Sequence, residues 1–179
     1  FIVKNGYDFQ GFKLKQPLIK EEKLKIIYPG TLFSYQKIEI FISAVKKISS
    51  INNSQIQVDF YGVEVNKKEL KRLQNLTKGF DSIFKIHPKI NKIELAEKLS
   101  KSDVGLITNY ENLKGCLPVK IFDYYYFGLI ILLCPSDNDE MQMFLEKTNS
   151  GVSVNNEDEC FQKLKELLRQ KKQGKLKRI

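Results

Sequence analysis

The residues best suited to chemistry lie between Glu111 and Gly128. Pro118 fits the first turn of a helix, where its missing N–H is harmless and its φ angle is preset. Residues 115–119 are therefore expected at a helix N-terminus, where free backbone N–H groups and the helix dipole can hold an anion such as a pyrophosphate. Lys120 adds a positive charge about one turn further on. Asp123 shares the helix face of Lys120, and its carboxylate could accept hydrogen bonds from both hydroxyls of a ribose.

A second candidate loop follows the first apolar run and contains Gly30 and Lys37. Gly30 permits a close approach of the backbone, and Lys37 can reach a phosphate as a mobile point charge. Both loops also have ordinary interpretations. A glycine after a strand commonly marks only a turn, and Lys120 with Asp123 could be a surface ion pair worth roughly a few tenths of a kcal/mol. Spacing alone does not decide between these interpretations.

Three other features attract attention, but their patterns favour structure over chemistry. His87, the single histidine, ends an expected strand and could line a nucleotide pocket, but no catalytic partner is evident and a structural role is favoured. The tyrosines at 124–126 occupy successive helix positions and cannot share one face, so core packing accounts for one or two of them. Cys116 has no neighbouring base in the sequence and is not expected to act as a nucleophile.

The elements that must position these residues alternate along the chain. Short apolar runs are separated by stretches with helical periodicity, the pattern of a parallel sheet covered by helices on both faces. Six strands are expected: Lys25–Tyr28, Gln57–Tyr61, Ser82–Ile86, Val104–Ile107, Leu129–Leu133 and Val152–Val154. The predicted fold class is therefore α/β, a Rossmann-like parallel sheet of about six strands. Ligands bind such sheets at the carboxyl ends of the strands, where both candidate loops begin.

Helices are marked by apolar stripes and by capping residues. Apolar side chains recur at spacings of three and four within 38–48 and within 161–168, which places each set on one helix face. Asn66 and Asn91 are each followed three residues later by a glutamate, Glu69 and Glu94. This spacing predicts an N-cap with a reciprocal partner at both positions.

The length and composition of the chain fit one domain. With 179 residues, 42% of them hydrophobic, the chain can bury one core but is too short for two full α/β domains. We expect a linker at residues 1–22, the Rossmann-like domain at 23–170 and a basic tail at 171–179. The three cysteines, Cys116, Cys134 and Cys160, are scattered and lack metal-ligand spacing, so neither a disulfide framework nor a metal site is expected. No segment has the length or pattern of a membrane span or signal peptide, and a cytoplasmic location is expected.

Positive charge is concentrated at the end of the chain. The formal net charge is +9, and from Lys163 onward eight basic residues face the single acid Glu166, a local charge of +7. Such a tail could follow nucleic acid or lie on an anionic membrane, where each basic residue contributes about 1 kcal/mol. It could equally be a solvated helix end favoured by the helix dipole. The sequence leaves both possibilities open.

Several segments resemble group 1 glycosyltransferases, which resemble glycogen synthase and sucrose synthase in fold. Residues Leu117–Tyr124, followed by Gly128–Ile131, are similar to the family segment in which a proline, a lysine, an acid and a tyrosine precede a glycine and a strand. Other similar segments occur in the family order: Asn5–Asp8 at the domain junction, Gly30–Leu32 at the glycine turn, Glu94–Leu106 before the acidic loop and Asn149–Val152 near the end.

This resemblance implies one half of a GT-B fold, the C-terminal domain that binds the donor. The implied enzyme transfers a sugar from a nucleotide-diphosphate sugar to an acceptor in glycan, polysaccharide or glycolipid synthesis, retaining the anomeric configuration and using no metal or other cofactor. Its implied partner is an N-terminal acceptor domain, without which this chain would be inactive. By position, the implied diphosphate-binding residues are Gly30, Lys37, Gly115, Cys116, Leu117 and Lys120. Asp123 would bind the ribose, and Glu111 would contact the transferred sugar as the catalytic residue.

The sequence departs from the family at informative positions. The family commonly has two glutamates separated by seven residues, whereas eleven separate Glu111 from Asp123. Thr31 stands where an arginine is common, which leaves Lys37 or Lys114 to neutralise phosphate. Two alternatives therefore stay open: a non-catalytic relative of the family, and a basic domain that binds nucleic acid or a membrane surface. A glycosyltransferase could also lie peripherally at the inner face of the membrane. Nucleic acid is disfavoured as a partner of such an enzyme.

Overall fold

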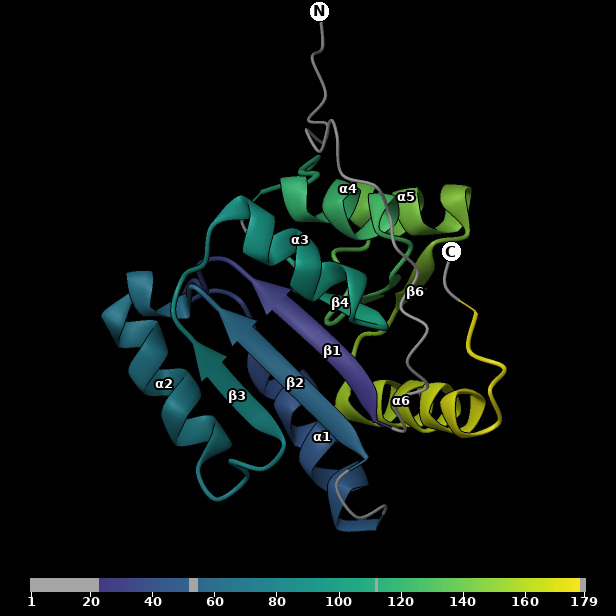
Figure 1. The fold of residues 1–179 in the computed structure, drawn as a ribbon. Coiled ribbons are helices and arrows are strands. Elements are labelled where there is room, and N and C mark those ends of the chain that lie inside the picture. Colours follow the sequence, from purple (N-terminus) through teal and green to yellow (C-terminus); the bar gives the residue numbers. More distant parts are fainter. Residues whose placement is uncertain (1–22, 52–54, 112, 178–179) are drawn as a thin grey trace, which may run out of the picture.

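A computed structural model describes residues 23–51, 55–111 and 113–177 of the chain. Both the Asn5–Asp8 motif and the expected linker at 1–22 lie outside the described residues. Six strands form one parallel sheet in the order β3-β2-β1-β4-β5-β6 (Figure 1). The strands are β1 (Leu24–Pro29), β2 (Ile56–Tyr61), β3 (Phe84–His87), β4 (Val104–Ile107), β5 (Ile130–Leu133) and β6 (Gly151–Ser153). The predicted α/β class and the six-stranded parallel sheet are confirmed.

The third strand begins later than the sequence predicts. It was expected at Ser82–Ile86, but the residues before Phe84 form a turn in which the amides of Ile83 and Phe84 donate to the carbonyl of Phe80, at 2.9 and 3.0 Å. Pairing with β2 therefore starts only at Phe84, opposite Val58. The other strands differ from their expected bounds by one residue at either end, or not at all.

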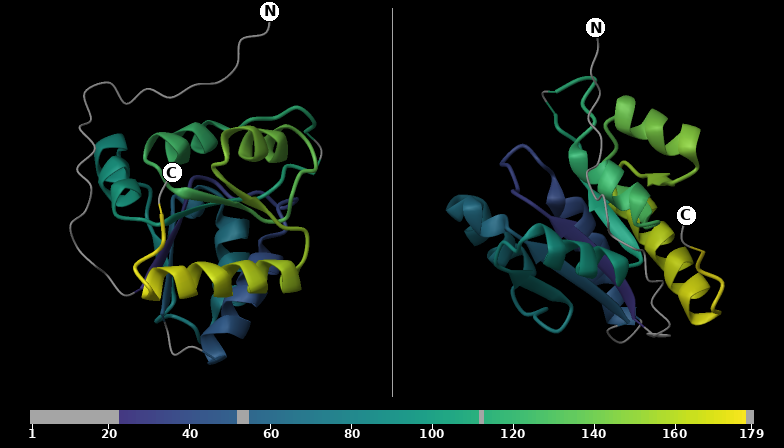
Figure 2. Two further views of the ribbon diagram at one scale, coloured as in Figure 1. Left: turned by 90° about the vertical axis from the view of Figure 1, so that its right-hand side faces the viewer. Right: turned by 45° about the horizontal axis from the view of Figure 1, so that its top comes forward.

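Helices cover both faces of this sheet. They are α1 (Ile38–Ile51), a short 3-10 helix (Val63–Val65), α2 (Lys67–Thr77), α3 (Lys92–Ser100), α4 (Val119–Tyr126), α5 (Glu140–Thr148) and α6 (Glu157–Lys172). Buried side chains of α1, α2 and α6 belong to one apolar layer, and those of α3, α4 and α5 belong to the other. Figure 2 shows α6 next to α1, with α4 and α5 on the other face of the sheet. Successive side chains of β1 point to opposite faces of the sheet, so the buried residues Ile26 and Ile27 pack into different apolar layers.

The helix starts follow the predicted capping residues only in part. Asn91 and Glu94 form a complete capping box, with bonds of 2.9 and 3.1 Å. Asn66 caps α2 by accepting from the amide of Glu69, but the carboxylate of Glu69 is bound to Arg72 and does not return to Asn66. The reciprocal contact predicted there is therefore wrong, because a buried ion pair takes the carboxylate instead.

Candidate functional site

The two candidate loops meet where the strand order reverses. β1 and β4 are neighbours in the sheet, while the chain proceeds outward from β1 to β2 and β3 on one side and from β4 to β5 and β6 on the other. Crevices form at the carboxyl ends of strands at such a reversal. Gly30 directly follows β1, and residues 108–111 directly follow β4 and lead toward α4. The fold therefore brings the two predicted loops to the same end of the sheet, and the region where they meet is called the crevice below, after the position that ligands take in folds of this kind.

The loop after β1 is held in place by a buried glutamine. Gln36 is 1% exposed, and its amide nitrogen donates to the hydroxyl of Thr108, just beyond β4, at 2.6 Å. Its amide oxygen accepts from the backbone N–H of Phe33 at 2.9 Å and from the hydroxyl of Tyr28 at 3.3 Å. One side chain thus fixes the loop to itself and to the neighbouring strand.

Arg72 of α2 holds the same loop from outside. Its Nη2 donates to the carbonyl of Gln36 at 2.6 Å, and its Nε and Nη2 both bind the carboxylate of Glu39 at 2.8 Å. Its Nη1 binds Glu69, whose side chain is 2% exposed. Such a forked, charge-assisted arrangement is rigid. Neither Gln36 nor Arg72 was predicted from the sequence, because their partners lie up to 72 residues away.

Lys120 reaches across the crevice from α4 to the end of β1. Its Nζ lies 3.9 Å from the centroid of the Tyr28 ring, and a β-carbon added to Gly30 would lie 3.7 Å from the same Nζ. The aromatic face stabilises the ammonium group, but burial lowers the pKa of Lys120 to about 7, against the opposing effect of Asp123. Burial also raises the pKa of Asp123 to about 6, although Lys92 and Lys120 oppose this. An anion bound here would help to restore the charge of Lys120.

Further residues of the crevice come from β2 and the segment after β3. Gly62 follows β2 with a φ of 81°, and a β-carbon on it would lie 3.8 Å from the Cα of Gly30. The Cβ of Lys89 lies 3.7 Å from the same position. Gly30 has a φ of 103°, so both glycines hold left-handed conformations that other residues rarely adopt. These three residues, Gly62, Lys89 and Lys92, were not predicted from the sequence, although the glycine directly after the second strand was an available signal.

Tyr124 anchors α4 to the sheet and so sets the position of Lys120. Its side chain is fully buried, and its hydroxyl donates to the carbonyls of Leu106 and Ile27, at 3.0 and 3.3 Å. A β-carbon on Gly105 would lie 2.3 Å from the tyrosine ring, so the ring occupies the space above that glycine. Tyr125, by contrast, is 42% exposed. The prediction that core packing accounts for one or two of the three tyrosines is thus confirmed for Tyr124.

The loop before α4 carries the other predicted diphosphate-binding residues. Pro118 is the N-cap of α4, one position before its predicted place in the first turn, and Val119 is the first helical residue. The amide of Gly115 does not face free solvent, since it donates to Oδ2 of Asp139 at 2.6 Å. Cys116 and Leu117 are half-buried, and burial together with Asp137 raises the pKa of the Cys116 thiol. This thiol is therefore protonated at neutral pH, as expected of a residue that is not a nucleophile.

The remaining predicted residues, Lys37 and Glu111, form an ion pair with each other. Their side chains are 61% and 34% exposed, so the pair is solvated and contributes little to stability. The structure brings the predicted phosphate-binding lysine and the predicted sugar-contacting acid together. Their separate roles stay predictions.

His87 has a partner that the sequence did not show. Its Nε2 lies 2.7 Å from Oδ1 of Asp59, and its ring stacks on Tyr61 with centroids 4.5 Å apart. This partner was not evident in the sequence, because the pairing of β2 with β3 is what brings two residues 28 apart into contact. The structural role favoured for His87 stays a prediction.

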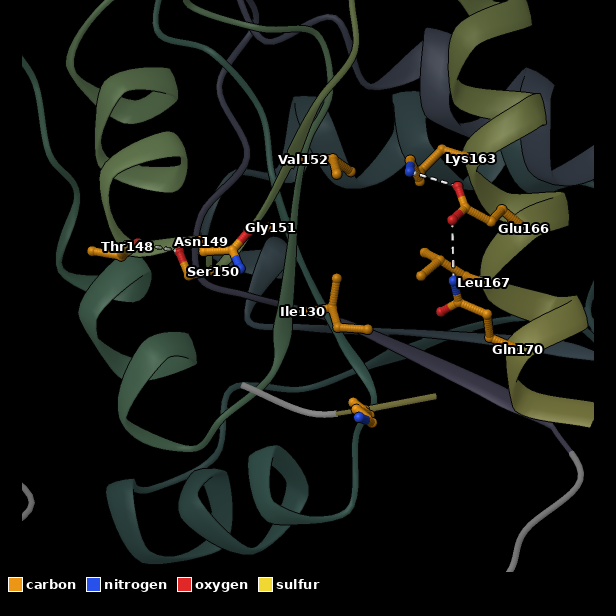
Figure 3. A pocket seen from close by; sticks show the side chains of 11 residues that line it. Ile130, Thr148, Asn149, Ser150, Gly151, Val152, Lys163, Glu166, Leu167 and Gln170 are labelled. Carbon is orange, nitrogen blue, oxygen red and sulfur yellow. Dashed lines mark hydrogen bonds and ion pairs between the residues drawn. The ribbon is translucent and has the colours of Figure 1, made fainter. Parts of the chain in front are cut away.

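A cavity of about 440 Å³ lies away from the crevice, between β6 and α6. It begins at Ile130 and Gly151, the first residues of β5 and β6, and thus lies near the amino ends of the strands. Figure 3 shows Lys163, Glu166 and Gln170 of α6 on its other wall, where Lys163 binds Glu166 at 2.6 Å and Gln170 binds Glu166 at 3.0 Å. These polar groups satisfy each other, so we place the candidate site at the crevice and not here.

The described part of the chain has neither a cluster of metal-binding side chains nor a helix that could span a membrane. Within residues 23–51, 55–111 and 113–177, no three histidine, cysteine or acidic side chains are grouped so that they could hold a metal ion. Over the same ranges, no helix has both the length and the apolarity needed to span a membrane.

Known proteins resemble this chain in structure but not detectably in sequence. No protein-family model matches it, and no curated protein matches it. Its fold is similar to that in a crystal structure of a GtfA/B complex, with 13% identity and a TM-score of 0.64 over 91% of this chain and 34% of that one. It is also similar to a co-structure of S. aureus MnaA with UDP, with 14% identity and a TM-score of 0.59 over 89% of this chain and 42% of the other. A third similar structure is AviGT4, a glycosyltransferase involved in avilamycin A biosynthesis, with 9% identity and a TM-score of 0.55 over 88% and 47%.

At such low identities these similarities establish the fold alone. The six-stranded parallel sheet with helices on both faces matches one half of a GT-B fold. The chain spans less than half the length of each of these three proteins.

Proposed function

We propose that this chain is the nucleotide-sugar-binding domain of a glycosyltransferase. The observation that carries the proposal is the position of Lys120, whose ammonium lies over Tyr28 and beside Gly30 at the point where the strand order reverses. A desolvated cation beside a glycine turn and a helix N-terminus is suited to a diphosphate, because each supplies positive charge or backbone donors. The structure of MnaA with UDP, which shares this fold, lends support.

The proposed roles follow from the geometry of the crevice. The Lys120 ammonium and the N-terminus of α4 would stabilise the diphosphate as it departs, which is the work that metal ions do in other transferases. Asp123, on the same helix, would accept hydrogen bonds from the ribose. Glu111 would contact the transferred sugar after exchanging its present partner, Lys37, for the substrate.

The proposed enzyme needs a second domain. The chain spans between 34% and 47% of the length of the three similar structures named above, and one of them is of a GtfA/B complex. We therefore propose that an N-terminal domain binds the acceptor, and that the whole protein builds a glycan, polysaccharide or glycolipid.

A second candidate function, a non-catalytic relative that keeps the fold, is favoured by the pairing of Lys37 with Glu111. That contact neutralises two groups assigned to substrate. The third candidate, a binder of nucleic acid or membranes, is weakened by the contacts of the basic tail. Lys171 binds Asp103 at 2.7 Å with both side chains largely buried, so part of the tail's charge serves the fold.

Calorimetric titration with UDP, GDP and ADP tests the proposal. We expect at least one diphosphate to bind, and Lys120→Met to weaken it by at least about tenfold, as loss of a charged hydrogen bond implies. Asp123→Ala should also weaken binding. Lys165→Met, which removes an exposed lysine on α6, is the matched control and should leave binding unchanged. Failure of all three nucleotides to bind at millimolar concentration would contradict the proposal, as would equal binding by the Lys120 and Lys165 variants.

A further inference from the structure

A side chain of the protein already occupies one of the backbone donors assigned to the diphosphate. The N–H of Gly115 donates to Oδ2 of Asp139 at 2.6 Å, across 24 residues of sequence. This length is short for a bond from nitrogen to a carboxylate, as expected when the acceptor is charged. A carboxylate oxygen presents the same charge and lone pairs to an N–H as a phosphate oxygen does.

The position of Asp139 is not explained by a capping bond in its own helix. It is the N-cap of α5, but its side chain makes no capping bond. That work falls to Asp137, whose two oxygens accept from the amides of Met141 and Gln142 at 2.8 and 3.1 Å. Asn138 between them adopts a left-handed conformation with a φ of 50°. The carboxylate of Asp139 is thereby directed away from α5 and toward the loop before α4.

Gly115 would otherwise be an open donor. The residue is exposed, has a φ of 69°, and has no heavy atom within 4 Å of the position its β-carbon would take. Within the described part of the chain, therefore, nothing crowds its side-chain side. A second acid lies close by, since Asp137 is near enough to raise the pKa of the Cys116 thiol. A diphosphate entering this side of the crevice would meet negative charge.

We infer that Asp139 competes with the donor diphosphate for the Gly115 amide and so sets the affinity of the site. The inference rests on the proposed function. In the ligand-free chain the carboxylate satisfies the amide. A diphosphate must displace the carboxylate before it can bind the amide. The affinity of the site for the diphosphate is therefore lowered by the free energy that the contact between Asp139 and Gly115 contributes to the ligand-free chain.

Calorimetry with UDP, GDP and ADP on three variants of the chain tests the inference. Asp139→Ala removes both the charge and the acceptor, and should tighten binding by about tenfold, the scale of one charged hydrogen bond. Asp139→Asn removes the charge but keeps an acceptor oxygen, and should give a smaller gain. Glu140→Gln is the matched control, since it removes one negative charge from the adjacent residue without touching Gly115 and should change affinity by less than about twofold.

A second measurement reports on the contact without ligand. The amide resonance of Gly115 in a ¹⁵N-HSQC spectrum should move upfield in Asp139→Ala relative to the unsubstituted chain, since the charged acceptor is lost. Glu140→Gln should leave the resonance in place.

The outcomes separate the two proposals. If the unsubstituted chain binds a nucleotide and Asp139→Ala binds it no more tightly, the competition is wrong while the proposed function stands. An equal gain from Glu140→Gln, or an unmoved Gly115 resonance, would likewise overturn the competition. If neither the unsubstituted chain nor any of the variants binds a nucleotide, the proposed function itself is wrong.

Discussion

The two walls of the crevice are built in different ways. The wall formed by residues 30–37 is tied to the fold by Gln36 and Arg72, whose side chains bind backbone groups, the buried carboxylate of Glu69 and the hydroxyl of Thr108. The wall formed by residues 113–118 is mostly exposed or half-buried, and Asp139 holds it at Gly115. One wall is attached through buried groups and the other through a solvated carboxylate.

This difference suggests a division of work between the walls. Buried, mutually satisfied polar groups rigidify a structure, whereas exposed backbone with few buried contacts opens at low cost. The first wall is therefore expected to be organised before a ligand arrives. The second is expected to adjust, exchanging Asp139 for the ligand. Substitutions in each wall can break or sharpen this comparison.

The largest effect is expected from Arg72→Met. Without the guanidinium, Glu69 keeps a side chain that is 2% exposed and loses its cation, so the free energy of unfolding should fall by about 3–5 kcal/mol. Urea unfolding followed by circular dichroism measures this. Lys47→Met is the control, because its ion pair with Asp158 is exposed and screened by solvent, so its loss should lower the free energy of unfolding far less. A loss for Arg72→Met no greater than the control would show that the first wall is not anchored as described.

Thr108→Val should have a moderate effect. Valine keeps the shape of threonine but leaves the buried amide nitrogen of Gln36 without its acceptor, at a cost of about 1–3 kcal/mol. The same unfolding experiment measures it. Ser50→Ala, which removes an exposed hydroxyl on α1, should change stability by less than about 0.5 kcal/mol. Equal stabilities of the two variants would count against a role for Gln36 in bracing the loop.

Lys120 should give the protein a distinctive pH dependence. Its pKa is about 7 in the folded chain and 10.5 ordinarily, so between these values the unfolded chain holds a proton that the folded chain lacks. The contribution of Lys120 to the free energy of unfolding therefore rises with pH across this window. Unfolding measured from pH 7 to 9.5 should show stability rising more steeply for the unsubstituted chain than for Lys120→Met. Lys165→Met should follow the unsubstituted chain, and parallel curves for Lys120→Met would refute the lowered pKa.

The smallest effect on stability is expected from Asp139→Ala. The contact with Gly115 is solvated, and after its loss water can satisfy the amide, so the free energy of unfolding should change by less than about 1 kcal/mol. A loss as large as that of Thr108→Val would mean that the second wall is as firmly built as the first. The comparison between the walls would then fail.

Local patterns in the sequence revealed much of the scaffold of this site. Apolar runs located the strands, and Pro118 located the start of α4 to within one residue, because both signals depend on neighbours in the chain. The closeness of Gly30 and Lys120 followed from the α/β pattern, since a parallel sheet brings the carboxyl ends of its strands to one edge.

Local sequence patterns did not predict the contacts between side chains that lie far apart in the sequence. Nothing near Arg72 in the sequence indicates that it binds the loop at Gln36, and nothing near Gly115 indicates Asp139. The same holds for His87 and Asp59, which meet only because β2 and β3 pair in one particular register. Such pairings depend on tertiary geometry, which cannot be inferred from residue types and their local spacing.

The fit between Gly105 and Tyr124 has a consequence for how this protein can evolve. The ring fills the space that a side chain at position 105 would need, and its hydroxyl joins the backbones of β1 and β4 to α4. Substitutions at the two positions are therefore expected to be coupled in evolution. A lineage that acquires a side chain at 105 must first accept a smaller residue at 124, and would lose the strut that aims Lys120. Any alignment of true descendants should show the two positions changing together or not at all.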